Sequence, residues 1–176
     1  KVLGVVLRAF RRAIDRALEK HALAKVFILR GNHDDVMALV LAHCLAMYYE
    51  RDPRVEVSVS PATFQWHRFG KCLFGFAHGD KTKTADLPLI MACDRQEDWG
   101  QTVHRQVLSG HLHHEIVKEY PGCTVRTLQT LAPKDAWHAS KGYRSGQSMI
   151  CEVWHREHGR VMQHSIGIAQ VRKRAA

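Results

Sequence analysis

Three apolar segments of this chain each end in a histidine beside a glycine. "AKVFIL" runs into "RGNHDD" at 30–35, "CLFGFA" runs into "HGD" at 78–80, and "QVLSGHLHHE" carries Gly110 followed by several histidines. Short apolar runs of this kind are typical of buried strands. In open α/β sheets, ligands bind at the carboxyl ends of strands, and glycine lets a ligand approach the backbone closely. The pattern therefore predicts strands that deliver polar side chains to a binding site.

Apolar periodicity along the chain predicts an α+β (α/β) fold. A stripe at spacings of three and four predicts a helix over 2–19, and "VMALVLAHCLAMYYE" predicts another over 35–49. The remaining expected elements are strands at 25–30, 55–59, 63–69, 71–77 and 103–109, a helix at 86–98, and an antiparallel set at 115–119, 123–128, 148–155 and 160–168. The 176 residues are expected to form one domain of sheets with helices outside, ending in a basic tail at 170–176.

The amino-acid composition favours certain binding partners and a certain cellular compartment. The formal net charge of +9 favours an anionic partner, such as nucleic acid or a phosphorylated substrate. No run of 18 or more apolar residues occurs, so no contact with a membrane is expected. The five cysteines are widely spaced without a C-x-x-C pair, which disfavours a disulfide framework and fits a reducing cytoplasm. Thirteen histidines are the unusual feature, and histidine is the commonest metal ligand.

The histidines of the third segment are arranged as a metal site requires. His111 and His113 are two positions apart, so in an extended chain both imidazoles point the same way. A single histidine at a strand end is most often a solvated loop residue. Three such strand ends in one chain favour a shared metal or catalytic site instead.

"GNHD", "AHGD" and "GHLHH" resemble, in order and spacing, the last three motifs of the calcineurin-like metallophosphoesterases: G-N-H-[DE], a later strand-end histidine, and G-H-x-H. The resemblance covers about residues 20–155, and "LAPKDAWHASKGYRSGQ" is similar to phage and prophage members described as DNA-repair exonuclease-like. It implies a four-layer αββα sandwich of two mixed sheets with a dinuclear metal site. It also implies a hydrolase of phosphomonoesters or phosphodiesters that uses a metal-bridged hydroxide, with DNA or RNA as the expected substrate.

The resemblance assigns roles residue by residue. Asn32, His78 and His111 would bind one metal ion, and His113 would bind the other. His33 would donate the proton to the leaving oxygen and is the catalytic candidate. Mixed nitrogen and oxygen ligands suit manganese, with iron or zinc as alternatives, better than calcium or magnesium.

Four further residues are candidates for substrate binding. Lys81 and Lys83 follow the AHGD motif and could attract a phosphate, although a solvated loop is the alternative. Trp137 and His138 lie in "DAWHASKGY", where they could line a substrate cleft by stacking, or pack in an ordinary way.

Two motifs of the family have no counterpart before Asn32. The family carries an early D-x-H and a G-D-x-x-D, whereas the acids found there are Asp15 and Glu19 in the helical stripe. We therefore expect an amino-terminally truncated domain that binds at most one of the two metals and is impaired as an enzyme. A catalytically inactive, basic binding module on the same scaffold is the alternative. The uncovered strand at 25–30 also predicts a homodimer or other self-association through the sheet edge.

Overall fold

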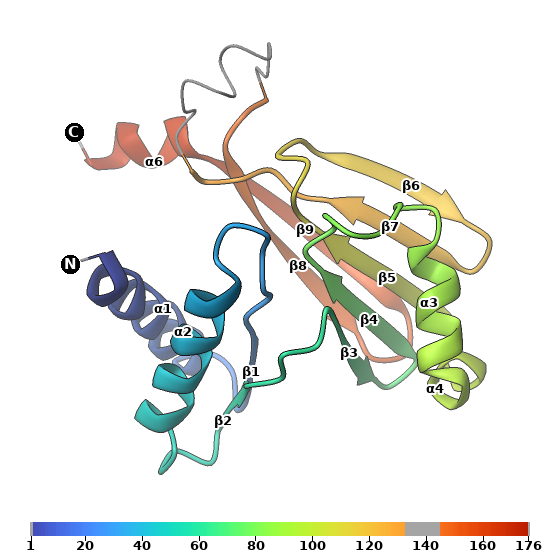
Figure 1. Ribbon diagram of the computed structural model, residues 1–176, viewed down its shortest axis with the longest axis horizontal. Coiled ribbons are helices and arrows are strands. Elements are labelled where there is room, and N and C mark those ends of the chain that lie inside the picture. Colours follow the sequence, from blue (N-terminus) through green and yellow to red (C-terminus); the bar gives the residue numbers. More distant parts are fainter. Residues whose placement is uncertain (1, 133–144, 176) are drawn as a thin grey trace. The chain divides into compact units, whose positions relative to one another are not determined.

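A computed structural model describes residues 2–132 and 145–175 (Figure 1). The chain forms two compact units, Lys1–Gln65 and Trp66–Ala176. Helices and a mixed five-stranded sheet make the fold α+β, as the sequence predicted. The number of domains and the four-layer sandwich stay predictions.

The first unit consists of two helices and a two-stranded sheet. Helix α1 (Val2–Leu18) precedes strand β1 (Ala24–Phe27), and helix α2 (Asp35–Tyr48) precedes strand β2 (Val55–Ser58). Strands β1 and β2 are parallel, with four paired positions that begin at Ala24 and end at Phe27. The strand expected at 25–30 therefore ends earlier than its apolar run, because β2 offers no partner beyond Ser58.

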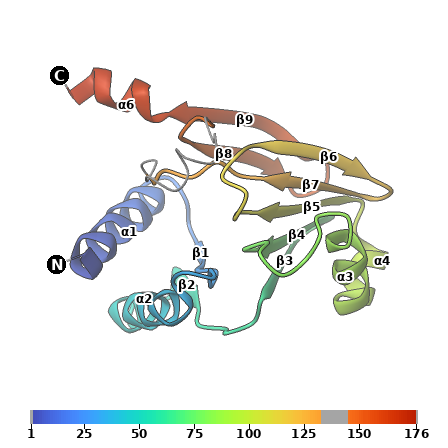
Figure 2. The same cartoon turned by 45° about the horizontal axis from the view of Figure 1, so that its top comes forward.

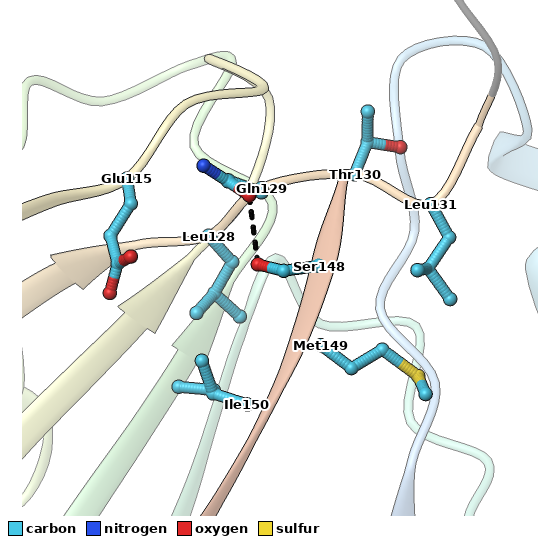
Figure 3. A pocket seen from close by; sticks show the side chains of 8 residues that line it. All are labelled: Glu115, Leu128, Gln129, Thr130, Leu131, Ser148, Met149 and Ile150. Carbon is cyan, nitrogen blue, oxygen red and sulfur yellow. Dashed lines mark hydrogen bonds between the residues drawn. The ribbon is translucent and has the colours of Figure 1, made fainter. Parts of the chain in front are cut away.

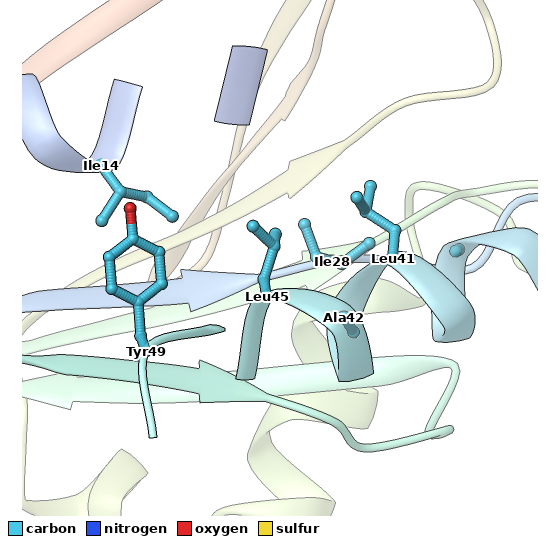
Figure 4. Close-up of a cluster of buried hydrophobic side chains, with 7 residues drawn as sticks. Ile14, Ile28, Leu41, Ala42, Leu45 and Tyr49 are labelled. Atoms are coloured by element: carbon cyan, nitrogen blue, oxygen red, sulfur yellow. The ribbon is translucent and has the colours of Figure 1, made fainter. Parts of the chain in front are cut away.

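The core of the first unit lies between its helices and its strands (Figure 4). Leu45 is completely buried, and Leu41 and Ala42 from the same helix pack with Ile28 after β1. Tyr49 closes one end of the cluster, where its hydroxyl donates a hydrogen bond of 2.6 Å to Asp15. Burial and this carboxylate together raise the pKa of Tyr49 well above its usual range. The apolar periodicity of α2 thus corresponds to a real core face.

We expect Leu45→Ala to lower the free energy of unfolding by about 2–5 kcal/mol, because it leaves a cavity in a fully buried site. Met47 is 71% exposed on the same helix and provides the control. Met47→Ala should change stability by about 0.5 kcal/mol or less. Urea denaturation followed by circular dichroism measures both, and equal effects of the two substitutions would contradict this core.

The second unit is built on a five-stranded sheet in the order β3-β4-β5-β7-β6 (Figure 1). The strands are β3 (Phe64–Phe69), β4 (Cys72–Ala77), β5 (His104–Ser109), β6 (Ile116–Tyr120) and β7 (Cys123–Thr127). Strand β5 runs parallel to both β4 and β7, whereas β6 is antiparallel to β7. The carboxyl ends of three adjacent strands therefore lie along one edge of this sheet.

A hairpin of β8 (Ser148–His155) and β9 (Gly159–Gly167) lies against one face of the sheet, and β9 leads into α6 (Ile168–Ala175) (Figure 2). The rings of Phe74 and Trp154 meet edge to face at 4.8 Å between centroids. Gln106, which is almost fully buried, donates a hydrogen bond of 2.9 Å to Glu152. Both contacts join side chains of the sheet to side chains of the hairpin, so two sheets pack face to face within this unit.

Helices α3 (Leu87–Asp94) and α4 (Gln96–Gln101) belong to the same unit, and α3 packs on the opposite face of the sheet. Met91 is completely buried, and a Cβ added to Gly75 would come within 2.8 Å of its side chain. Glycine at this position of β4 therefore lets the helix approach the sheet. The single helix expected at 86–98 is interrupted at Arg95, whose φ of −129° and ψ of 47° are not helical.

Most expected elements occur within two residues of their predicted bounds, including the late strands β8 and β9. Of the segment 170–176, expected as a basic tail, residues 170–175 lie in α6, and residue 176 lies outside the described residues. Over the part of the chain that the structure describes, no helix has both the length and the apolarity needed to cross a bilayer.

Asp98 of α4 provides a test of how charge stabilises the second unit. Arg68 donates a hydrogen bond of 3.2 Å to one carboxylate oxygen, and Arg95 Nε donates one of 2.8 Å to the other. Burial raises the pKa of Asp98, but the hydrogen bonds from Arg95 and Arg68 outweigh burial and lower the pKa below its ordinary value. A lowered pKa means that the stabilisation is present above the unfolded pKa and is lost as the pH falls through the folded one.

We therefore expect Asp98→Asn to lower the free energy of unfolding by about 1–2 kcal/mol at neutral pH. The difference from wild type should shrink as the pH falls below about 4, from the unfolded pKa of the carboxylate through its lower folded pKa. Urea denaturation at several pH values measures it, with the exposed Asp94 replaced by Asn as the control. A difference that does not depend on pH would contradict the charged role of Asp98.

Candidate metal centre

Two of the predicted ligands meet at the carboxyl ends of adjacent parallel strands. His78 directly follows β4, and His111 comes two residues after β5. Ala77 and Ser109 are paired across the two strands, so the chain leaves the sheet at the same level on both. The imidazole centroids of His78 and His111 are 5.3 Å apart, with an interplanar angle of 70°. A backbone hydrogen bond of 3.0 Å from Gly110 N to His78 O joins the two loops.

The separation of the two rings suits a shared metal ion. Two imidazoles bound to one ion at a metal–nitrogen distance of about 2.1 Å, with tetrahedral or octahedral angles, have centroids roughly 4.5–5.3 Å apart. The observed 5.3 Å lies at the upper end of this range. This pair of residues therefore fits two ligands of one ion.

Gly79 makes the close approach of the two loops feasible. Gly79 has a φ of +98°, which L side chains rarely adopt, and a Cβ there would collide with the side chain of Ser109. At Gly110, a Cβ would lie 3.4 Å from the carbonyl oxygen of His78. The packing of the two loops thus requires glycine at position 79, whereas a Cβ at Gly110 would make an ordinary van der Waals contact.

The segment after Gly110 is a tight turn, which corrects one inference from the sequence. His111 and His113 have φ values of 61° and 57°, both left-handed, and Leu112 N donates to Gly110 O at 2.7 Å. The argument that both imidazoles point the same way assumed extended chain and is wrong here, because β5 already ends at Ser109. Non-glycine residues in this region cost of order 1–3 kcal/mol each and are concentrated at functional sites.

Asn32 and His33 belong to the first unit, in the turn between β1 and α2, and both are exposed. Asp34 is the residue that precedes the helix, and its carboxylate accepts a hydrogen bond of 2.8 Å from Gly31 N. This bond shapes the GNHD turn from within. The ligand role of Asn32 and the acid role of His33 stay predictions.

The structure says less about the four candidates for substrate binding. Lys81 and Lys83 are exposed in the loop after β4, and Trp137 and His138 lie outside the described residues. In residues 2–132 and 145–171, no group of three or more His, Cys, Asp or Glu side chains gathers as a metal site. His78 and His111 are therefore a pair rather than a complete set of ligands.

A pocket of about 460 Å³ lies at the end of β7 (Figure 3). Its lining residues are Glu115, Leu128, Gln129, Thr130, Leu131, Ser148, Met149 and Ile150. Ser148 donates a hydrogen bond of 2.8 Å to the side chain of Gln129 across this pocket. Apolar walls with one carboxylate suit an apolar group and disfavour a phosphate. The sequence offered no signal for it beyond the strand pattern around 148–155.

Sequence reasoning also missed two residues at the end of β7 that hold the histidine turn. Thr127 and Arg126 are 2% and 3% exposed, respectively. Both contact the segment that follows His113. The available signal was "TVRT", an apolar-polar strand pattern that includes an arginine.

No family model matches this chain, and no curated protein matches it. Among solved structures, a similar one is the crystal structure of a conserved uncharacterized protein, a predicted phosphoesterase, from Streptococcus pneumoniae TIGR4. The alignment covers 82% of this chain and 96% of the pneumococcal chain, with 10% sequence identity and a TM-score of 0.31. At that TM-score the likeness carries no argument about this protein.

Proposed function

We propose that this chain carries part of the metal centre of a metallophosphoesterase, a hydrolase of phosphate esters. One observation carries the proposal: His78 and His111 end adjacent parallel strands with their rings 5.3 Å apart, a separation that suits one metal ion. The order of the GNHD, AHGD and GHLHH motifs supports the same function.

The amide oxygen of Asn32 is the third proposed ligand, with water completing the coordination, and His113 is assigned to a second ion. Manganese is the favoured metal, with iron or zinc as alternatives. A divalent ion supplies Lewis acidity toward phosphoryl oxygens. Neutral imidazole and amide ligands leave its charge uncompensated, which favours an anionic substrate. We assign His33 to proton donation at the leaving oxygen, and the formal charge of +9 supports DNA or RNA as substrate.

Metal binding tests this proposal directly. Calorimetric titration of the 176-residue chain with Mn²⁺ or Zn²⁺ should show one weak site and no second one. His111→Ala should weaken binding about tenfold or more, because it removes one of two adjacent ligands. His164→Ala is the matched control, since His164 is an exposed histidine of β9 that lies in none of the three motifs. Equal loss in both variants, or no binding by wild type, would refute the metal centre.

Hydrolysis should be weak even where metal binds. The D-x-H and G-D-x-x-D carboxylates of the family do not occur before Asn32, so the group that bridges two metals is missing from its expected place. We expect these 176 residues to hydrolyse bis-p-nitrophenyl phosphate near the background rate, even with saturating Mn²⁺. Turnover that is rapid and metal-dependent would show that other residues of the chain replace those carboxylates.

A catalytically inactive, basic binding module remains the second candidate, favoured by the net charge of +9 and by the missing carboxylate motifs. Salt-dependent binding of DNA without metal-dependent hydrolysis would support it. Self-association through the strand at 25–30 and a cytoplasmic location also stay predictions.

A further inference from the structure

The turn that carries His111 needs support from outside itself. His111 and His113 are both left-handed, a conformation that persists in non-glycine residues only where surrounding contacts impose it. Within the turn, Nδ1 of His114 donates a hydrogen bond of 2.7 Å to Leu112 O. Hydrogen bonds to the exit of this turn come from the end of β7.

Thr127 holds the exit of the turn with a single hydroxyl. Its Oγ1 donates a hydrogen bond of 3.0 Å to His114 O and accepts one of 2.9 Å from Ile116 N. Thr127 is 2% exposed, so water does not readily replace either bond. The hydroxyl thereby fixes the backbone on both sides of Glu115.

Arg126 binds the side chain of Glu115, which lies between His114 and Ile116. Its guanidinium donates a hydrogen bond of 2.7 Å to the carboxylate of Glu115 and another of 2.7 Å to Gln163 of β9. The side chain of Arg126 is 4% exposed, and a charge-assisted bond in such a site is strong and directional. The end of the turn is thus tied to both the sheet and the hairpin.

We propose that Thr127, assisted by Arg126, is a positioning residue for the metal centre. Its hydroxyl keeps the turn in the conformation that places the ring of His111 beside that of His78. Without it, the exit of the turn loses two backbone contacts and the left-handed residues relax. This inference rests on the proposed function, because it assigns Thr127 to the same histidine pair.

Thr127→Val tests the inference, since valine keeps the shape of threonine and removes the hydroxyl. We expect Zn²⁺ affinity to fall about tenfold and the absorption of the Co²⁺-loaded chain to change. Thr127→Ser retains a hydroxyl and should restore both. Val125→Ala is the control for instability alone: Val125 is 2% exposed in the same strand, so the variant should unfold more easily yet bind Zn²⁺ like wild type.

Amide hydrogen exchange of the metal-free protein supplies a second readout. Exchange at Leu112 and Ile116 should be faster in Thr127→Val than in wild type, with no such change in Val125→Ala. If wild type binds Zn²⁺ and Thr127→Val shows the same Zn²⁺ affinity and the same amide exchange, the role of Thr127 is overturned. The proposed metal centre would not be affected by that result. A wild-type chain that binds neither Zn²⁺ nor Co²⁺ would overturn the proposed metal centre together with the inference.

Discussion

The parallel pairing of β4 with β5 is the constraint on which the candidate site depends. In this register, Ala77 lies opposite Ser109, so residues more than thirty positions apart leave the sheet side by side. His78 and His111 then meet because each follows its strand almost immediately. A shift of the register by two residues would move the two rings apart by about 7 Å, farther than one metal ion can bridge.

A buried polar layer between the sheet and the hairpin keeps the second unit in this arrangement. Arg126 faces Glu152 at 3.7 Å, and Arg160 of β9 donates a hydrogen bond of 2.8 Å to the same carboxylate. Gln106 reaches that carboxylate from β5. Buried ion pairs contribute little net stability, but removing one partner leaves a buried charge uncompensated. The layer therefore specifies how the hairpin lies on the sheet, and through Arg126 it also reaches the histidine turn.

Local patterns predicted the elements well and their connections less well. The strand expected at 71–77 is β4 (Cys72–Ala77), because apolar runs of that length have few other solutions. The helix expected at 86–98 breaks at Arg95, where the pattern shows no glycine or proline. The orientation of His111 and His113 was inferred for extended chain, although both residues are left-handed and lie in a turn whose exit is hydrogen-bonded to β7. No spacing rule within "GHLHH" includes a threonine thirteen residues after its last histidine.

Local sequence patterns were enough to give the order of helices and strands, the histidines at the strand ends, and the glycines beside them. Those properties depend on neighbouring residues and are therefore visible in a local pattern. The meeting of His78 with His111, and the hydrogen bonds from Thr127 and Arg126 to the exit of the turn, became visible in the folded chain. These contacts arise from strand pairing and from burial between two sheets, which join residues that are distant in the chain. A local pattern holds no information about which distant strand supplies the partner.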